Sequence, residues 1–146
     1  MSYKILTQPN PILSTPAEKV EIIDNKIKYI IDRMYNIIQS KGIGMAAPQI
    51  GVSKRIIVLN TKGYEDGVKI SICNPEIVFH SENKIKDKER CLSCPGVEKE
   101  IERWETIIIS GLNYDGQNCT LELKGITARA AQQEIDHING ILIIDK

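Results

Sequence analysis

The sequence predicts an α+β fold in one domain that spans all 146 residues. Two observations predict it: helical periodicity near both ends of the chain, and several β-branched segments between them. A chain of this length buries about two thirds of its unfolded surface, so its core needs neither disulfides nor a structural metal. We therefore expect an N-terminal helix, antiparallel β-sheets and a second helix near the C-terminus.

The first helix is predicted between residues 24 and 41. Apolar side chains recur there every three or four positions, as a helix with one buried face requires. Asp24 is suited to cap the first turn, and Gly42 follows the last turn. The first sixteen residues are the one proline-rich stretch and are interpreted as an irregular arm.

The middle of the chain is predicted to form strands. RIIVLN follows the glycine-containing loop at 42–51, and VKISIC and EIVFH indicate two further strands before a charged connection near 81–88. TIIISGLNYD and CTLELKG flank Asp115-Gly116, a dipeptide typical of hairpin turns. The segment ITARAAQQEIDHING then becomes helical in composition and ends at Gly140, a candidate C-cap.

Composition excludes several classes of function. The chain has 19 Lys+Arg and 19 Asp+Glu, a formal net charge of zero that argues against direct nucleic-acid or anionic-membrane binding. No N-terminal basic segment leads into an apolar run, so we expect a soluble, cytoplasmic protein. The four cysteines are too few and too unevenly spaced for a disulfide framework, which agrees with a protein from a reducing compartment. Two histidines, His80 and His137, exclude a three-histidine metal site.

The last predicted helix places Gln133 and His137 on one face, with Glu134 beside them. This is the spacing of a metal-binding HExxH helix, but Gln stands where the first His would be. Without a further ligand, these residues are more typical of a solvated polar face than of a metal site.

Cys91 is the candidate third ligand, because thiolate and imidazole are ligands that Zn²⁺ or Fe²⁺ selects. The simpler interpretation is a buried, inert cysteine. Cys94 completes a C-x-x-C, which is also compatible with a redox pair or half of a zinc knuckle. As a substitute metal ligand Cys94 is disfavoured, because along an extended strand it would point away from Cys91.

The loop GIGMAAPQ at 42–49 is either a tight connection or a substrate contact. Phosphate binding is not predicted, because the residues that follow are expected to form a strand and to supply no Lys or helix N-terminus aimed at the loop. The functional alternative uses exposed backbone amides and the Gln49 carboxamide as hydrogen-bond donors.

GIGMAAPQ, ERCLS at 89–93 and QQEIDHING at 132–140 together resemble the three ordered signatures of peptide deformylases, GxGxAAxQ, EGCLS and QHExDHxxG. With the flanking PQIGVSKRIIVLN and CPGV, the resemblance covers most of the chain. It implies an enzyme that removes the N-formyl group from the initiator methionine of nascent bacterial proteins. It also implies that the second helix is buried and carries the metal site, with one divalent ion, usually Fe²⁺, replaceable by Zn²⁺ or Ni²⁺.

The resemblance assigns roles to residues. Cys91 and His137 match metal ligands, and Glu134 matches the base that passes a proton to the leaving amine. Gln49 and the backbone N–H of Leu92 match donors to the oxyanion. The backbone of Ile43 and Gly44 matches an edge along which the peptide pairs as an added strand, and apolar walls near Ile43 and the last helix would receive the methionine side chain.

Two residues depart from the family pattern. Gln133 replaces the first metal-binding His; its neutral amide oxygen suits Mg²⁺ or Ca²⁺ better than Fe²⁺, so we expect metal to be weakly bound or absent. Arg90 replaces the Gly before Cys91, and either narrows the cleft or forms an ion pair with a carboxylate such as Glu89 or Glu134.

Three functions therefore stay open. The first is a deformylase with a Cys91, Gln133 and His137 site. The second is a catalytically impaired relative, natural or engineered through Gln133, that binds N-terminal peptides. The third is a thiol-disulfide protein that uses Cys91 and Cys94. The expected partners are formyl-Met peptides or nascent chains at the ribosome, and the expected state is a monomer. His80 is predicted to be structural.

Overall fold

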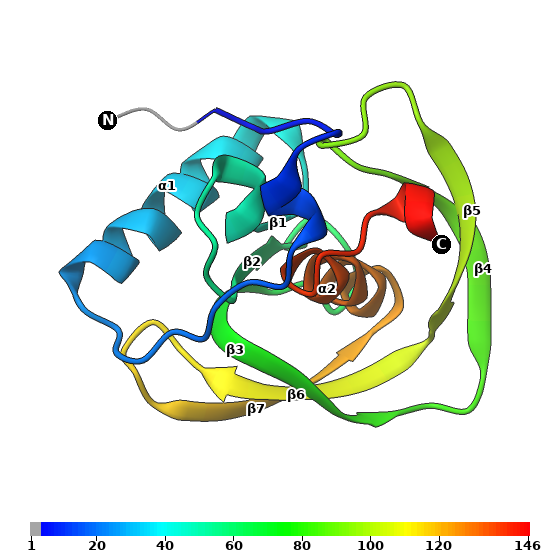
Figure 1. Ribbon diagram of the computed structural model, residues 1–146. Helices are drawn as coiled ribbons and strands as arrows, with labels where there is room; N and C mark the ends of the chain where they lie inside the picture. Colours follow the sequence, from blue (N-terminus) through cyan, green and yellow to red (C-terminus); the bar gives the residue numbers. More distant parts are fainter. Residues whose placement is uncertain (1–3) are drawn as a thin grey trace.

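A computed structural model describes residues 4–146 and confirms the α+β class. Two α-helices pack on opposite faces of a five-stranded antiparallel sheet, and a two-stranded sheet lies beside the second helix (Figure 1). Three short 3₁₀ turns complete the fold. In chain order the elements are η1 (Pro11–Ser14), α1 (Asn25–Lys41), β1 (Gly44–Ala46), η2 (Ala47–Ile50), β2 (Ile56–Asn60), β3 (Lys69–His80), β4 (Lys84–Arg90), β5 (Glu98–Trp104), β6 (Thr106–Leu112), β7 (Asn118–Lys124), α2 (Gly125–Ile138) and η3 (Ile143–Asp145).

The larger sheet has the strand order β1-β2-β3-β6-β7, and every neighbouring pair is antiparallel. β1 is therefore an edge strand, with one side paired to β2 and the other side open. β4 and β5 form a separate two-stranded sheet. Residues on the open side of β1 can reach backbone groups of a bound peptide, which makes this edge relevant to function.

β2 is buried on both faces, because a helix covers each side. Ile56 and Val58 belong to the apolar cluster that includes α1, whereas Ile57 and Leu59 belong to the cluster that includes α2. This follows from the alternation of side chains along a strand. The strand is accordingly apolar at consecutive positions, as strands between two layers are.

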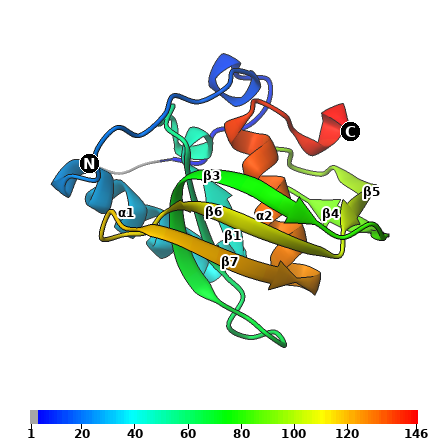
Figure 2. The same cartoon turned by 90° about the horizontal axis from the view of Figure 1, so that it is seen from below.

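α2 lies at the centre of the molecule (Figure 1). The curved sheet formed by β3, β6 and β7 covers one side of it, with β4 and β5 at the far end of these strands (Figure 2). Helix residues such as Ala128, Ala131 and Ile138 are fully buried. Small side chains let the surrounding strands approach α2 closely. The prediction that the second helix is buried is therefore confirmed.

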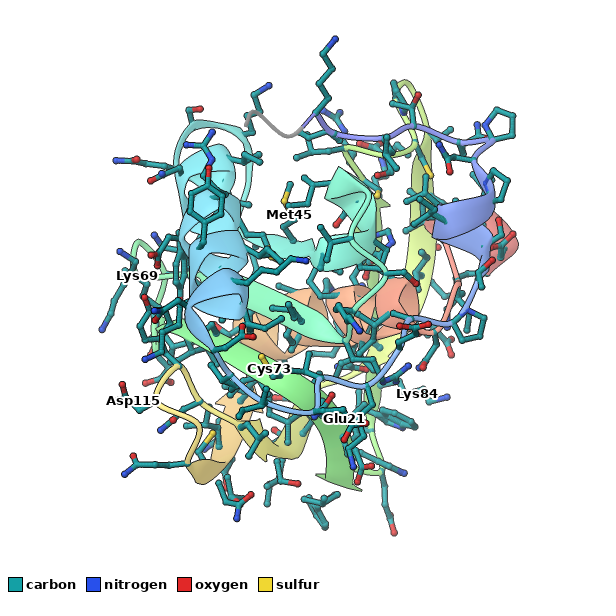
Figure 3. The ribbon with its side chains drawn as sticks, turned by 60° about the vertical axis from the view of Figure 1, so that its left-hand side comes forward. Glu21, Met45, Lys69, Cys73, Lys84 and Asp115 are labelled. Atoms are coloured by element: carbon teal, nitrogen blue, oxygen red, sulfur yellow. The ribbon has the colours of Figure 1, made fainter. Side chains whose placement is uncertain are left out.

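Figure 3 shows the interior and the periphery of the same arrangement. Met45 and Cys73 lie inside, where both are buried in the cluster that includes α1. Lys69, Lys84 and Asp115 lie at the outer edge (Figure 3). Within residues 4–146, neither helix has the length and hydropathy needed to cross a membrane.

Local sequence signals at the helices and the hairpin are confirmed. The Asp24 side chain accepts a hydrogen bond from the Ile27 amide, and Gly42 caps the other end of α1. Asp115-Gly116 forms the turn between β6 and β7, with Gly116 at φ +79°. Gly140 follows α2 at φ +77° and lies against the Ser14 backbone, where a Cβ would come within 2.8 Å of a carbonyl carbon.

Three predictions about strands are wrong. The two strands expected at 68–80 are one continuous strand, β3, because a register shift between Cys73 and Glu76 lets pairing with β6 continue past Pro75. The charged connection near 81–88 is largely strand β4, which pairs with the unpredicted β5. The loop at 42–51 contains β1 and η2.

Candidate active site

A cavity of about 690 Å³ lies between the open edge of β1, the turn that follows β4, and α2. Its walls include Ile126 and Ala130 of α2. All nine residues predicted for the site line this cavity: Ile43, Gly44, Gln49, Arg90, Cys91, Leu92, Gln133, Glu134 and His137. The fold therefore brings the three sequence motifs to one place.

The Cys91 thiol and the His137 ring lie close together in the wall of the cavity. Cys91 Sγ lies 3.3 Å from His137 Nε2. Two ligands of one tetrahedral ion, at typical sulfur and nitrogen bond lengths, would lie about 3.5 Å apart. Burial raises the pKa of Cys91 to about 12 and lowers the pKa of His137 to about 4. Both groups are thus neutral near pH 7, and a nearby cation would favour the thiolate that a metal requires.

Glu134 lies beside this pair, with its Oε1 3.9 Å from His137 Nε2. Burial raises the pKa of Glu134 to about 8, and the charge of Arg103 opposes the shift. Oε1 of Glu134 is buried and has no hydrogen-bond partner within the described residues. A solvated polar face is therefore excluded for Glu134 and His137, and the carboxyl is suited to exchange protons with a molecule in the cavity.

The Gln49 carboxamide is held between β1 and the turn after β4. Its Oε1 accepts the Ala46 amide at 3.0 Å, and its Nε2 donates to Ser93 Oγ at 3.2 Å. Nε2 also lies 3.8 Å from Cys91 Sγ. Ser93 further donates its backbone N–H to Cys91 Sγ at 3.4 Å. Ser93 was not predicted as a site residue, although it lies within the ERCLS motif.

Gln133 lines the cavity, but its amide nitrogen is directed at the backbone. Nε2 donates to the Arg90 carbonyl at 3.1 Å, which links α2 to the end of β4. Among residues 4–146, no group of three or more His, Cys, Asp or Glu side chains could hold a metal ion. Cys91 and His137 therefore supply two side chains suited to bind a metal ion, and the Gln133 side chain lines the same cavity.

Arg90 pairs with neither carboxylate that the sequence suggested. Its Nε donates to Glu98 Oε2 at 2.8 Å, across the strand pair β4–β5. Glu89 points instead into the interior, because side chains alternate along β4. Its carboxylate forms ion pairs with Arg103 and Arg129.

Arg103 joins the two segments that carry Cys91 and His137. It donates twice to Glu89, with Nε–Oε2 at 2.9 Å and Nη2–Oε1 at 2.8 Å. Its Nη1 donates to Asp136 Oδ2 at 2.5 Å. Glu89 precedes Cys91 by two residues, and Asp136 immediately precedes His137. Arg103 was not predicted, because nothing local marks a charged residue of β5 as buried.

Cys94 does not point away from Cys91, so that expectation is wrong. Residues 91–94 form a turn, in which the Cys94 amide donates to the Cys91 carbonyl at 3.0 Å. The two thiols share a hydrogen bond, but Cys94 is buried and burial raises its pKa, as it does for Cys91. Protonated, buried thiols lack the reactivity of a redox pair, so the site does not favour the thiol-disulfide hypothesis.

The open edge of β1 presents the polar groups of Gly44. The Asn60 backbone N–H donates to the Ile43 carbonyl at 2.8 Å, so the backbone polar groups of Ile43 point towards β2. Those of Gly44, the next residue, therefore point outward from the sheet. A Cβ on Gly44 would lie 3.0 Å from Glu134 Oε2. Gly44 therefore permits close contact between this edge and the Glu134 carboxyl, whereas Ile43 contributes to the cavity wall.

His80 lies outside the cavity, on β3, where its ring stacks on Trp104 with centroids 3.9 Å apart. This agrees with the predicted structural role.

Comparison with known proteins identifies the family of this chain. The family model for polypeptide deformylase matches residues 2–146. Peptide deformylase from Aquifex aeolicus is 41% identical, with 100% of this chain and 88% of the relative covered. Among solved structures, peptide deformylase from Ehrlichia chaffeensis in complex with actinonin gives a TM-score of 0.92 at 41% identity, covering 99% of this chain and 88% of that one. That from Thermotoga maritima gives 0.92 at 35% identity, covering 100% and 97%. The chain belongs to the polypeptide deformylase family.

Proposed function

We propose that the protein hydrolyses the formyl group of N-formylmethionyl peptides in this cavity. The observation that carries the proposal is the Cys91–His137 pair, with Sγ and Nε2 3.3 Å apart and the Glu134 carboxyl beside them. Peptide deformylases are metal-dependent hydrolases, and the whole described chain superimposes on their structures.

The residues present fit a divalent ion in two of three positions. Cys91 Sγ and His137 Nε2 are spaced for a common ion, and within residues 4–146 the buried Glu134 Oε1 has no hydrogen-bond partner. The third position offers only the Gln133 carboxamide oxygen, a neutral and hard ligand. When bound, the ion supplies a Lewis acid that allows water to act as a nucleophile at neutral pH. We infer Fe²⁺, with Zn²⁺ or Ni²⁺ as substitutes, at low affinity.

Gly44 and the apolar wall would position the peptide. The outward N–H and C=O of Gly44 can pair with its backbone as an added strand. Ile43, Ile126 and Ala130 line the cavity and offer apolar contact to the methionine side chain. The formyl carbon would then lie between Cys91, Glu134 and Gln49.

Two donors and one acid–base group would act on the formyl carbon. Gln49 Nε2 and the Leu92 N–H would stabilise the negative charge that develops on the formyl oxygen. Glu134 would accept a proton from the attacking water and deliver it to the amine nitrogen as the C–N bond breaks. The products are formate and a peptide with a free amino terminus.

Replacing Glu134 with glutamine tests this role directly. Kinetics with formyl-Met-Ala-Ser, on protein loaded anaerobically with Fe²⁺, should show a kcat at least about 100-fold lower than that of the parent protein, because general acid–base groups contribute about 10²- to 10⁴-fold. Glu122→Gln is the matched control, since Glu122 is exposed on β7 and outside the cavity. An unchanged kcat in Glu134→Gln would contradict the proposal.

Gly44→Ala should lower kcat/KM by up to about 10-fold with little loss of stability, because the shift it forces is smaller than about 1 Å. The new Cβ would lie 3.0 Å from Glu134 Oε2 and 3.2 Å from both Glu134 Cγ and Leu59 Cδ2, so these side chains must shift by a few tenths of an ångström. A displacement of about 1 Å at a reacting group costs up to about 100-fold. Gly63→Ala, where a Cβ meets nothing within 4 Å, should retain full activity. Equal kinetics in the two variants would show that Glu134 is not constrained by this contact.

The cellular setting is part of the same proposal. We infer a cytoplasmic monomer that meets formyl-Met peptides or nascent chains at the ribosome. Deformylation could be undetectable even with metal present while peptides still bind at the Gly44 edge. In that case the protein is a catalytically inactive relative that binds N-terminal peptides.

A further inference from the structure

The mouth of the cavity carries three cationic side chains, Lys41, Lys88 and Arg90, which we call the cationic rim. The Arg90 side chain is 81% exposed and that of Lys88 is 69% exposed. Within the described chain, the other ionisable side chains of the cavity wall are paired or buried deeper. A peptide leaving the cavity therefore meets positive charge first.

Arg90 ends a ladder of ion pairs between β4 and β5. Its partner Glu98 is shared with Lys88, whose Nζ lies 3.9 Å from Oε1. One carboxylate thus faces two cations at the cavity, and the rim stays net positive. Within the described residues, Arg90 donates a hydrogen bond to Glu98 through Nε alone, so both terminal Nη groups can bind another carboxylate. The remaining ion pairs of this ladder, between Lys86 and both Glu100 and Glu102, lie farther along the two strands and do not line the cavity.

The route of the peptide past this rim follows from β1. Gln49 Oε1 already accepts the Ala46 amide, so the open edge is closed at that end. A strand paired with Gly44 must extend in the other direction, towards Gly42 and Lys41. The residues that follow methionine would then cross the cationic rim.

We propose that the cationic rim makes the protein select formyl-Met peptides with an acidic side chain at the second position after methionine. Arg90 is the main determinant, because it stands where the motif EGCLS has a glycine without a side chain. This inference rests on the proposed function and adds a substrate preference to it. The contact is exposed, so it acts on binding rather than on the chemical step.

Three peptides test the preference: formyl-Met-Ala-Glu, formyl-Met-Ala-Gln and formyl-Met-Ala-Lys, each with an amidated C-terminus so that only the side chain differs in charge. Calorimetric binding is measured on the metal-loaded Glu134→Gln protein, in which turnover is suppressed. At about 0.02 M salt it should show the Glu peptide about three- to fivefold tighter than the Gln peptide, and the Lys peptide weaker by a similar factor. In kinetics the difference should appear in KM and not in kcat. At 0.5 M salt it should nearly vanish, because exposed charges are then screened.

Arg90→Gln should reduce the ratio of Glu-peptide to Gln-peptide affinity to below about twofold, whereas the matched Lys86→Gln variant should retain it. Equal affinity of all three peptides for the protein that retains Arg90 would overturn the preference and leave the deformylase proposal standing. A preference that persists in Arg90→Gln would overturn the role of Arg90. Failure of every peptide to bind at millimolar concentration would overturn both proposals.

Discussion

Gln133→His is expected to raise kcat/KM for a formyl-Met peptide by at least about 100-fold over the parent protein at limiting metal. Cys91 and His137 already face each other at 3.3 Å, and Gln133 occupies the next turn of the same helix face. An imidazole there would complete a Cys-His-His set for Fe²⁺ or Zn²⁺. Removing even a residue that only orients a ligand costs about 10- to 100-fold, so a missing ligand should cost more.

Gln133→Leu is the matched control for this gain. It keeps a side chain of similar volume but has no donor atom, and it also removes the hydrogen bond to the Arg90 carbonyl. We expect its activity to be no higher than that of the parent protein. If Gln133→His binds metal fully yet stays inactive, Arg90 would be the block, and Gln133→His combined with Arg90→Gly should then recover turnover.

Arg103→Met is expected to lower the free energy of unfolding by about 3 to 5 kcal/mol. Arg103 is 4% exposed and is the side chain that joins Glu89 to Asp136. Its removal leaves Glu89 buried with only Arg129, and a buried carboxylate that loses its main partner is costly. Urea unfolding followed by circular dichroism measures the change.

Lys86→Met provides the comparison on the same strand pair. Lys86 is 57% exposed and lies 3.9 to 4.0 Å from two carboxylates, so its loss should cost less than about 1 kcal/mol. A similar, small loss in both variants would mean that the Glu89–Arg103–Asp136 cluster does not stabilise the fold. Arg103→Met should also weaken metal binding, because Glu89 and Asp136 flank the residues that face each other in the cavity.

Elements with a local signal could be predicted from sequence. α1 and α2 have helical periodicity and end signals, and the β6–β7 hairpin has Asp115-Gly116. β4 has no such signal, because nearly all of its side chains are exposed and charged. Its partners are the glutamates of β5, which lie 8 to 16 residues away and become visible only once the strands pair. The two strands expected from VKISIC and EIVFH are likewise one strand, because a register shift in the pairing with β6, which no local signal shows, lets β3 continue.

The site was predictable as far as its motifs extend. Cys91, Glu134 and His137 were located by motif spacing, and the resemblance supplied their roles. The motifs do not contain Arg103 or Glu98, and they could not reveal that the Gln133 amide turns to the Arg90 carbonyl. These contacts depend on how β4, β5 and α2 pack, which no single segment encodes.

The affinity of the cavity for a divalent ion decides whether Gln133 limits the activity of this protein. Anaerobic titration with Co²⁺, followed by thiolate-to-cobalt absorption, gives the dissociation constant of a site that contains Cys91. We predict that the parent protein binds at least about 100-fold more weakly than Gln133→His. Equal dissociation constants, with one tightly bound ion in each protein, would contradict the inference that the missing histidine weakens the site.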